Sequence, residues 1–180
     1  MAQRTKLNLG TAGYAQRDAA IGSDDPVVRA EAALERLAGE FAVWMHDECE
    51  RLEAAREDAV HHGLTQKTHG PLFRAAHDIK GEAAIFGYPA LAGAADSLCR
   101  LLEHTPQLTR IPIALVDQHV SAVRAIFREY DRPNLSKMAS ALTNKLRDVT
   151  DEFLERENCF RPDYLESILA PPLVPKTPGR

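Results

Sequence analysis

Hydrophobic residues recur every three or four positions over most of the chain, which is the period of an amphipathic α-helix. Glycine and proline residues interrupt this pattern and set the expected helix ends. The pattern predicts helices over residues 27–62, 68–86, 89–104, 112–130 and 135–157. No segment alternates in the manner of paired strands. Because the helices are joined by short loops, the sequence predicts an all-α protein, with the last four helices in an antiparallel four-helix bundle and an additional long N-terminal helix.

The same period predicts which residues face the core. In the long first helix these are Leu34, Ala38, Phe41, Met45, Cys49 and Leu52, and in the third they are Leu91, Ala95, Leu98 and Leu102. In the fourth and fifth helices they are Ile113, Val116, Val120, Val123, Phe127, Tyr130, Leu135, Met138, Leu142, Leu146, Val149 and Phe153. The flanking segments lack this pattern. We therefore expect a flexible leader at 1–24, a helical bundle at 25–158 and a proline-rich tail at 159–180 that has room for one or two helical turns at 164–169.

Composition narrows the protein class. A hydrophobic content of 44% excludes a disordered chain, and a net charge of -4 gives no reason to expect nucleic acid as a partner. No apolar stretch reaches the ~18 residues that a membrane span needs. The three cysteines are widely spaced and odd in number, which is typical of reduced thiols. These features predict a cytoplasmic protein that does not bind a membrane.

The second predicted helix has an unusual outer face. On a helical wheel Leu72, Ala76, Ile79, Ala83 and Phe86 form the inner stripe. The opposite side carries Phe73, His77, Lys80, Gly81 and Ala84. Glycine costs ~1 kcal/mol relative to alanine inside a helix, and a phenylalanine is unusual on an exposed face. The outer face is therefore a candidate for a functional role.

His77 is the candidate reactive residue on this face. The small side chains at Gly81 and Ala84 leave its imidazole accessible, and Lys80 lies one turn away. Imidazole is a good nucleophile at neutral pH, and a nearby ammonium group offsets the charge of a phosphoryl group. This pattern is typical of a phosphorylatable histidine. The alternative is a solvated surface histidine beside a glycine that merely eases helix packing.

The segment His77-x-x-Lys80-Gly81, with Gly87, Leu91 and Leu98 after it, resembles the histidine-containing phosphotransfer (HPt) domain of two-component phosphorelays. Residues 73–103 look most like the phosphotransfer domain of chemotaxis histidine kinases. The resemblance implies that His77 accepts a phosphoryl group from the aspartate of a receiver domain or passes one on, assisted by Lys80 and Gly81. The implied partners are receiver domains of response regulators or of hybrid histidine kinases, which supply their own Mg²⁺.

An outward Phe73 beside small residues suggests a contact patch, and we expect a docking surface around His77 formed by Phe73, Arg74, Ala84, Gly87 and Tyr88. One feature departs from the chemotaxis-kinase pattern, in which a carboxylate on the next helix orients the imidazole. Cys99 occupies that place, and Asp96, one turn earlier, is the candidate substitute. Glu82 also adds negative charge after Gly81. No segment resembles an ATP site, so we expect a monomeric phosphocarrier without a cofactor of its own rather than an enzyme.

Other interpretations remain open at this point. The chain has features of a binding module that docks receiver domains without carrying phosphoryl groups. The run His77-Asp78-Ile79-Lys80 is similar to the dimerisation helix of sensor kinases, although Gly81-Glu82 stand where a Thr or Asn and a Pro usually follow.

His46, Cys49 and Glu50 share a helix face but lack the second pair of ligands that a metal site needs. The remaining histidines are expected at helix ends, without suitable partners.

Overall fold

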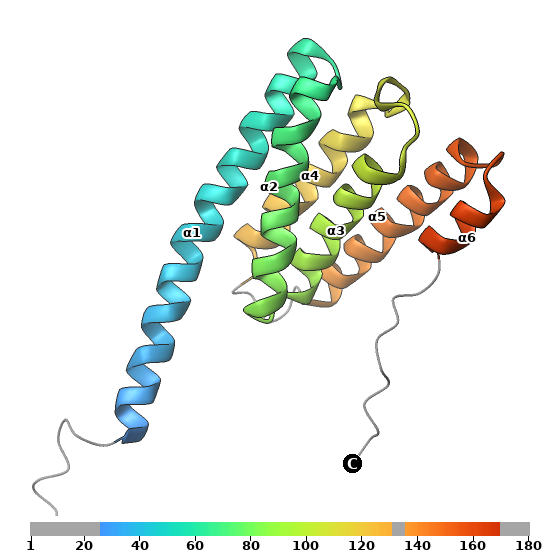
Figure 1. Ribbon diagram of the computed structural model, residues 1–180. Helices are drawn as coiled ribbons and strands as arrows, with labels where there is room; N and C mark the ends of the chain where they lie inside the picture. Colours follow the sequence, from blue (N-terminus) through green and yellow to red (C-terminus); the bar gives the residue numbers. More distant parts are fainter. Residues whose placement is uncertain (1–25, 131–135, 170–180) are drawn as a thin grey trace, which may run out of the picture. The chain divides into compact units, whose positions relative to one another are not determined.

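The structure is a computed structural model that describes residues 26–130 and 136–169, apart from the side chains of residues 34, 35 and 38. Every regular element within these ranges is a helix, which confirms the predicted all-α class (Figure 1). The elements are α1 (Pro26–His62), α2 (Gln66–Ile85), α3 (Pro89–His104), the short 3₁₀ helix η1 (Leu108–Arg110), α4 (Ile113–Arg128), α5 (Ser136–Glu157) and α6 (Pro162–Leu169).

The chain divides into two compact units, residues 1–40 and 41–180. The described part of the first unit is the beginning of α1, at residues 26–40, and the predicted leader at 1–24 lies outside the described residues. The predicted core residues Leu34 and Ala38 belong to this unit, and their side chains are also outside the description. The candidate site belongs entirely to the second unit.

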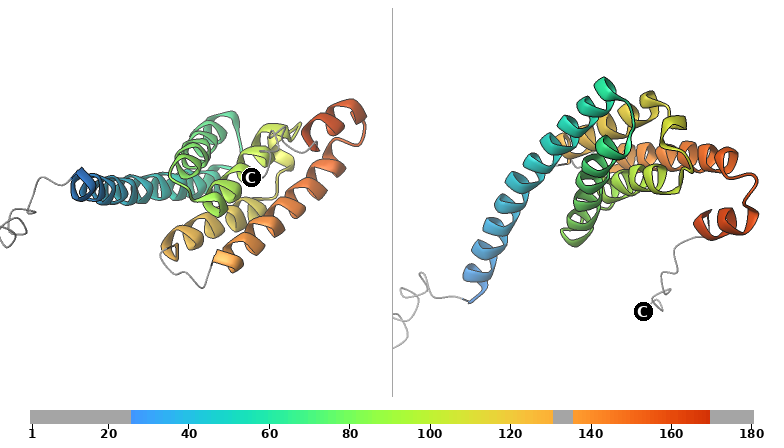
Figure 2. Two further views of the ribbon diagram at one scale, coloured as in Figure 1. Left: turned by 90° about the horizontal axis from the view of Figure 1, so that it is seen from below. Right: turned by 45° about the horizontal axis from the view of Figure 1, so that its top comes forward.

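In the second unit α3 is the central helix. It packs against α2, α4 and α5, and α5 in turn contacts α4 and α6 (Figure 2). The part of α1 that belongs to this unit buries Phe41, Met45, Cys49 and Leu52, as its hydrophobic stripe predicts. Its polar side chains form ion pairs with α2 and α4, through Arg51–Asp78 and Arg56–Asp117. The antiparallel four-helix bundle of α2 to α5 with an additional N-terminal helix is therefore confirmed.

Local sequence explains where α2 begins and ends. Thr65 caps the helix by accepting from the backbone amide of Thr68, whose hydroxyl accepts from the amide of Thr65 in return. This capping box starts α2 two residues before the predicted position. Gly63 and Gly87 adopt positive φ values of 77° and 80°, which glycine tolerates without steric cost. The two glycines end α1 and α2 as the sequence predicts.

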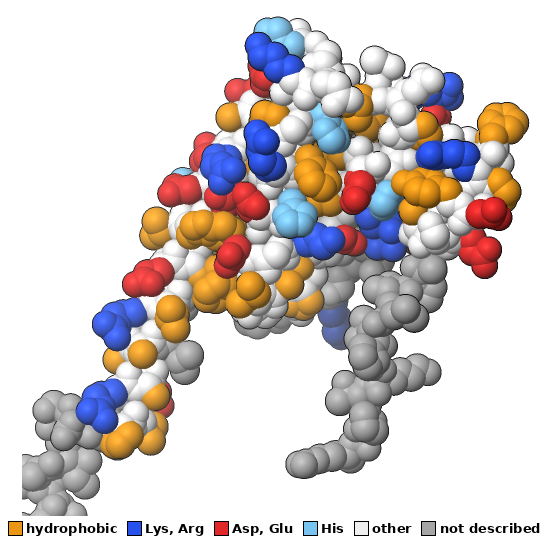
Figure 3. Space-filling model, in the orientation of Figure 1, with side chains coloured by type: hydrophobic (Ala, Val, Ile, Leu, Met, Phe, Trp, Pro, Cys, Tyr) orange, Lys and Arg blue, Asp and Glu red, His pale blue; other side chains and the backbone are white. Residues whose placement is uncertain are grey.

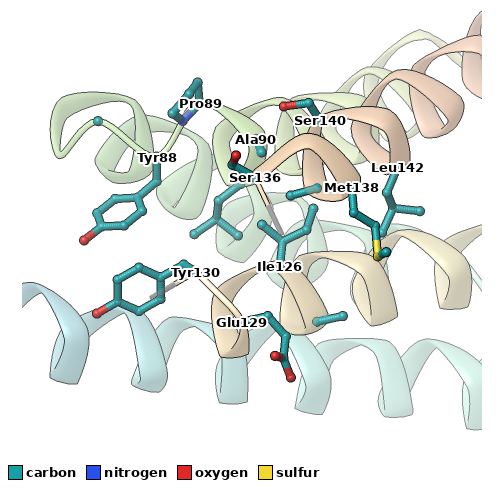
Figure 4. Close-up of a pocket in the computed structure, with 14 residues that line it drawn as sticks. Tyr88, Pro89, Ala90, Ile126, Glu129, Tyr130, Ser136, Met138, Ser140 and Leu142 are labelled. Atoms are coloured by element: carbon teal, nitrogen blue, oxygen red, sulfur yellow. The ribbon is translucent and has the colours of Figure 1, made fainter. Parts of the chain in front are cut away.

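Three predicted core residues are exposed instead. Phe86 is 40% exposed at the end of α2, and Met138 and Leu142 on α5 are 67% and 37% exposed. Met138 and Leu142 line a cleft of about 380 Å³ between the beginning of α5 and the Tyr88 region (Figure 4). Sequence periodicity identifies the apolar side of α5, but it does not reveal that this side faces a cleft near the N-terminus of the helix. Leu135 lies outside the described residues.

The C-terminal segment forms about two helical turns, as predicted, but they begin two residues earlier. Residues 162–169 form α6, in which Ile168 is buried. The guanidinium of Arg100 donates to the carbonyl of Ile168 at 2.6 Å, and His104 Nδ1 lies 3.0 Å from the hydroxyl of Tyr164. These contacts attach the beginning of the predicted tail to α3, and residues 170–180 lie outside the described residues. None of the described helices combines the length and hydrophobicity of a membrane-spanning segment.

Candidate functional site

The site lies on the outer face of α2. The buried residues on the opposite face of the helix determine how this outer face is oriented. Leu72, Ala76, Ile79 and Ala83 are fully buried at i, i+4, i+7 and i+11. Because these four residues hold one side of α2 in the core, residues on the other side point away from it. The structure thereby confirms the outward placement of His77 that the wheel predicts.

The imidazole of His77 is accessible, with 62% of the side chain exposed. Its ring lies 5.9 Å from that of Phe73, which lies 5.9 Å from the ring of His69 one turn earlier. The three rings form a row along α2, and Figure 3 shows histidine, hydrophobic and basic side chains close together on this face. Nδ1 of His77 lies 4.0 Å from the carboxylate of Asp78. Phe73 is thus half-buried between two histidines rather than freely exposed.

Gly81 leaves open space beside the imidazole. A Cβ atom at position 81 would have no neighbour within 4 Å outside its own helix backbone. The glycine therefore does not serve close packing within the described structure, and the alternative that it merely eases helix contact is not supported. Gly93 on α3 is different, because a Cβ there would lie 2.7 Å from the methyl group of Thr143.

Lys80 forms an ion pair across the α2–α3 contact. Its Nζ atom lies 2.7 Å from Oδ1 of Asp96, and the other oxygen of Asp96 accepts from Arg147 of α5 at 3.2 Å. The hydrogen bond to Asp96 raises the pKa of Lys80 above its ordinary value. In the described part of the chain, no hydrogen bond or ion pair joins Asp96 to His77. Orientation of the ring by Asp96 therefore stays a prediction, because no direct contact between the two described side chains supports it.

Cys99 contributes a buried thiol behind Lys80. Burial raises its pKa to about 12, an effect that the nearby Lys80 charge partly offsets. The thiol is therefore neutral at physiological pH and adds no negative charge to the site. Asp96, one turn earlier on α3, is the charged group beside Lys80.

The predicted docking residues separate into two groups. Phe73, Arg74 and Ala84 lie on α2 with His77, and Arg74 and Ala84 are exposed. Gly87 and Tyr88 follow the end of the helix. The ring of Tyr88 stacks on Phe41 at 4.7 Å and meets the edge of Tyr130 at 4.9 Å. Tyr88 thus belongs to an aromatic cluster at the end of the bundle.

Sequence analysis does not identify a buried polar group around His119. His119, expected near a helix end without partners, lies inside α4 and is fully buried. Its Nε2 atom is 3.1 Å from Oγ of Ser97 and 3.0 Å from Oγ1 of Thr150, which come from α3 and α5. Its Nδ1 atom lies 2.7 Å from the carbonyl of Leu115, which can only accept, so Nδ1 carries the proton. His119 therefore links three helices, and nothing in its local sequence signals these distant hydroxyl groups.

Three of the other histidines bond to backbone carbonyls. His61 and His62 bond to backbone carbonyls in the last turn of α1, and His69 bonds to the carbonyl of Leu102. Cys49 is buried in the core. Among the described residues, no three His, Cys, Asp or Glu side chains lie close enough to hold a metal ion.

Comparison with known proteins adds one match. No curated protein and no solved structure matches the chain. A family model described as the Hpt domain matches residues 36–157, a range that contains the four bundle helices and His77. Hpt domains are phosphocarriers that act in two-component signalling and interact with receiver domains. Both the fold and the match over most of the chain support one conclusion: this chain belongs to the Hpt domain family.

Proposed function

We propose that this protein is a phosphorelay intermediate that carries a phosphoryl group on His77 between the aspartates of receiver domains. The observation that carries the proposal is the exposed ring of His77 beside the open space at Gly81. A receiver must bring its aspartate within bonding distance of the ring, and this site leaves room for that approach. Lys80 provides a positive charge one turn away.

The transfer step is a displacement at phosphorus. A neutral imidazole with its proton on Nδ1 attacks the phosphorus of a receiver's aspartyl phosphate through Nε2. The N–P bond forms as the P–O bond breaks, and the aspartate carboxylate leaves with the bonding electron pair. The carboxylate of Asp78 lies 4.0 Å from Nδ1, the ring nitrogen that does not attack. The reverse reaction passes the group to a second receiver.

The remaining site residues have supporting roles in this proposal. Lys80 offsets the charge of the phosphoryl group, and Gly81 keeps the approach to the ring open. Phe73, Arg74 and Ala84 contact the receiver around His77, and Gly87 and Tyr88 contact it beyond the end of α2. The receiver supplies Mg²⁺, and positioning of the two partners accounts for most of the catalysis.

We further propose that the protein acts as a cytoplasmic monomer without autokinase activity. The three cysteines are free thiols, two of them buried, which suits a reducing compartment. With ATP and Mg²⁺ alone, the purified chain is expected to acquire no label. Stoichiometric self-labelling under these conditions would instead favour a sensor-kinase fragment.

Two successive transfers test the relay role against simple docking. The chain is first incubated with a phosphorylated receiver domain, separated from it, and then mixed with a second, unlabelled receiver. A relay intermediate acquires acid-labile label in the first step and loses it to the receiver in the second. A binding module would form a complex with the receiver in both steps and acquire no label in either.

A further inference from the structure

Lys80 is bound to a carboxylate that has a second cationic partner. Asp96 places Oδ1 2.7 Å from Nζ of Lys80 and Oδ2 3.2 Å from Nη1 of Arg147. The side chains of Lys80, Asp96 and Arg147 are 43%, 27% and 32% exposed, so solvent screens this group less than a pair on the open surface. Two cations from different helices therefore share one half-buried carboxylate.

Arg147 is itself held on its other side. Its Nε atom donates to Oδ2 of Asp151 at 2.9 Å, one turn later on α5. The other oxygen of Asp151 accepts from Arg100 at 2.7 Å, and Arg100 also donates to the carbonyl of Ile168 at 2.6 Å. Positive and negative side chains alternate in this series of ion pairs from Lys80 to Arg100. Arg147 is thus fixed against Asp96, whereas Lys80 is the exposed end of the series.

We propose that Arg147 is a positioning residue that frees Lys80 for the phosphoryl group of His77 by sharing the carboxylate of Asp96. This inference rests on the function proposed above. Lys80 and His77 are three residues apart on α2, so their side chains project from neighbouring positions on the same face. When a phosphoryl group appears on His77, Lys80 exchanges Asp96 for the phosphoryl oxygens.

Charge pairing explains why Arg147 is needed for this exchange. A half-buried carboxylate that loses its only cation is left uncompensated, which is costly. With Arg147 present, Asp96 keeps a charged partner after Lys80 has left. Without Arg147, Lys80 is the only described partner of Asp96, and its departure would strand the carboxylate. Removal of Arg147 should therefore hold Lys80 on Asp96 and away from His77.

Single and double substitutions test this mechanism. Arg147→Met is expected to slow phosphoryl transfer to His77 by ~2- to 5-fold, in line with the loss of one ion-pair partner. Asp96→Asn alone removes the charge that retains Lys80 and measures what Asp96 itself contributes, and adding Arg147→Met to that variant should slow transfer no further. Arg156→Met is the matched control, since Arg156 lies on α5 and pairs with Glu152 one turn earlier in the described part of the chain; this variant should transfer at the wild-type rate. If Arg147→Met slows transfer as much in the Asp96→Asn background as in the wild type, the proposal is wrong.

The state of Lys80 gives a second readout that does not depend on phosphorylation. An NMR titration of its side chain reports its pKa in the full chain. Arg147→Met should raise that pKa further, because a competing cation is lost, and Arg156→Met should leave it unchanged. An unchanged Lys80 pKa in Arg147→Met would overturn the proposal even if transfer is slow. If wild-type chain accepts no phosphoryl group, the proposed function fails, while this titration still decides whether Arg147 controls Lys80.

Discussion

Gly93 on α3 faces Thr143 on α5 so closely that a Cβ at position 93 would lie 2.7 Å from the Thr143 methyl group. The hydroxyl of Thr143 also donates to the carbonyl of Ala90 at 2.8 Å, which holds α5 against this part of α3. Gly93 is therefore required by packing between two helices. Gly81, on the exposed face of α2, meets no such neighbour.

Alanine substitutions should separate the two glycines by stability. Gly93→Ala is expected to lower the free energy of unfolding by about 1–3 kcal/mol, since the added methyl group overpacks the α3–α5 contact. Gly81→Ala should raise it by ~0.5–1 kcal/mol, because alanine favours the helix and the site is open. Urea denaturation of both variants measures these changes. A loss of stability in Gly81→Ala comparable to that in Gly93→Ala would show that Gly81 is also a packing residue.

Size at position 81 should control transfer more than charge at position 80. Gly81→Arg places a long side chain beside the imidazole of His77, so it should fold normally and accept phosphoryl groups at a severely reduced rate. Lys80→Ala removes one charge but leaves the ring accessible, so its defect should be milder. The rates are compared with one phosphorylated receiver at equal concentrations. Wild-type transfer by Gly81→Arg together with an inactive Lys80→Ala would contradict the steric role of Gly81.

Acid should destabilise the fold through His119. Burial lowers the pKa of His119 below its ordinary value, so the unfolded chain binds a proton at this residue more readily than the folded one. Above the unfolded-state pKa of ~6.5 the ring is neutral in both states and does not reduce the free energy of unfolding. The free energy of unfolding decreases as the pH falls below that value. Burial also lowers the pKa of His104, which adds to the same trend.

Urea denaturation between pH 7.5 and 5.5 measures this dependence. The free energy of unfolding of the wild type should decrease toward low pH, and His119→Gln should show a shallower slope whatever its absolute stability. Combining His119→Gln with His104→Gln should flatten the slope further. Equal slopes for the wild type and His119→Gln would mean that His119 is not responsible.

The three thiols should react in two classes. Cys159 is exposed, whereas Cys49 and Cys99 are buried and burial raises the pKa of each to about 12. A thiol reagent should therefore label one cysteine rapidly in the folded protein and all three in denaturant. Mass spectrometry of the digested protein identifies the labelled site. Rapid labelling of Cys99 in the folded chain would contradict its place behind Lys80.

Local pattern predicts much of this fold and part of the site. The spacing of Leu72, Ala76, Ile79 and Ala83 places His77 on the outer face, and the positive φ angles of Gly63 and Gly87 follow from the residue type. Such features depend on neighbours within one helix, so they can be predicted from a single sequence.

Contacts between helices could not be predicted in this way. The pairing of Lys80 with Asp96 and of Asp96 with Arg147 joins three helices, and so does the group of His119, Ser97 and Thr150. Their geometry depends on how the helices are rotated and offset against one another. A helical wheel shows which face a residue occupies, but it does not show which residue of another helix lies opposite.

Phosphoryl acceptance by His77 tests the account most directly. The wild-type chain and His77→Gln are each incubated with the same phosphorylated receiver domain, and acid-labile label on the chain is measured. The account predicts label on the wild type and none on His77→Gln, with unfolding free energies that agree within ~0.5 kcal/mol because an exposed side chain contributes little to the core. Undiminished labelling of His77→Gln would contradict it.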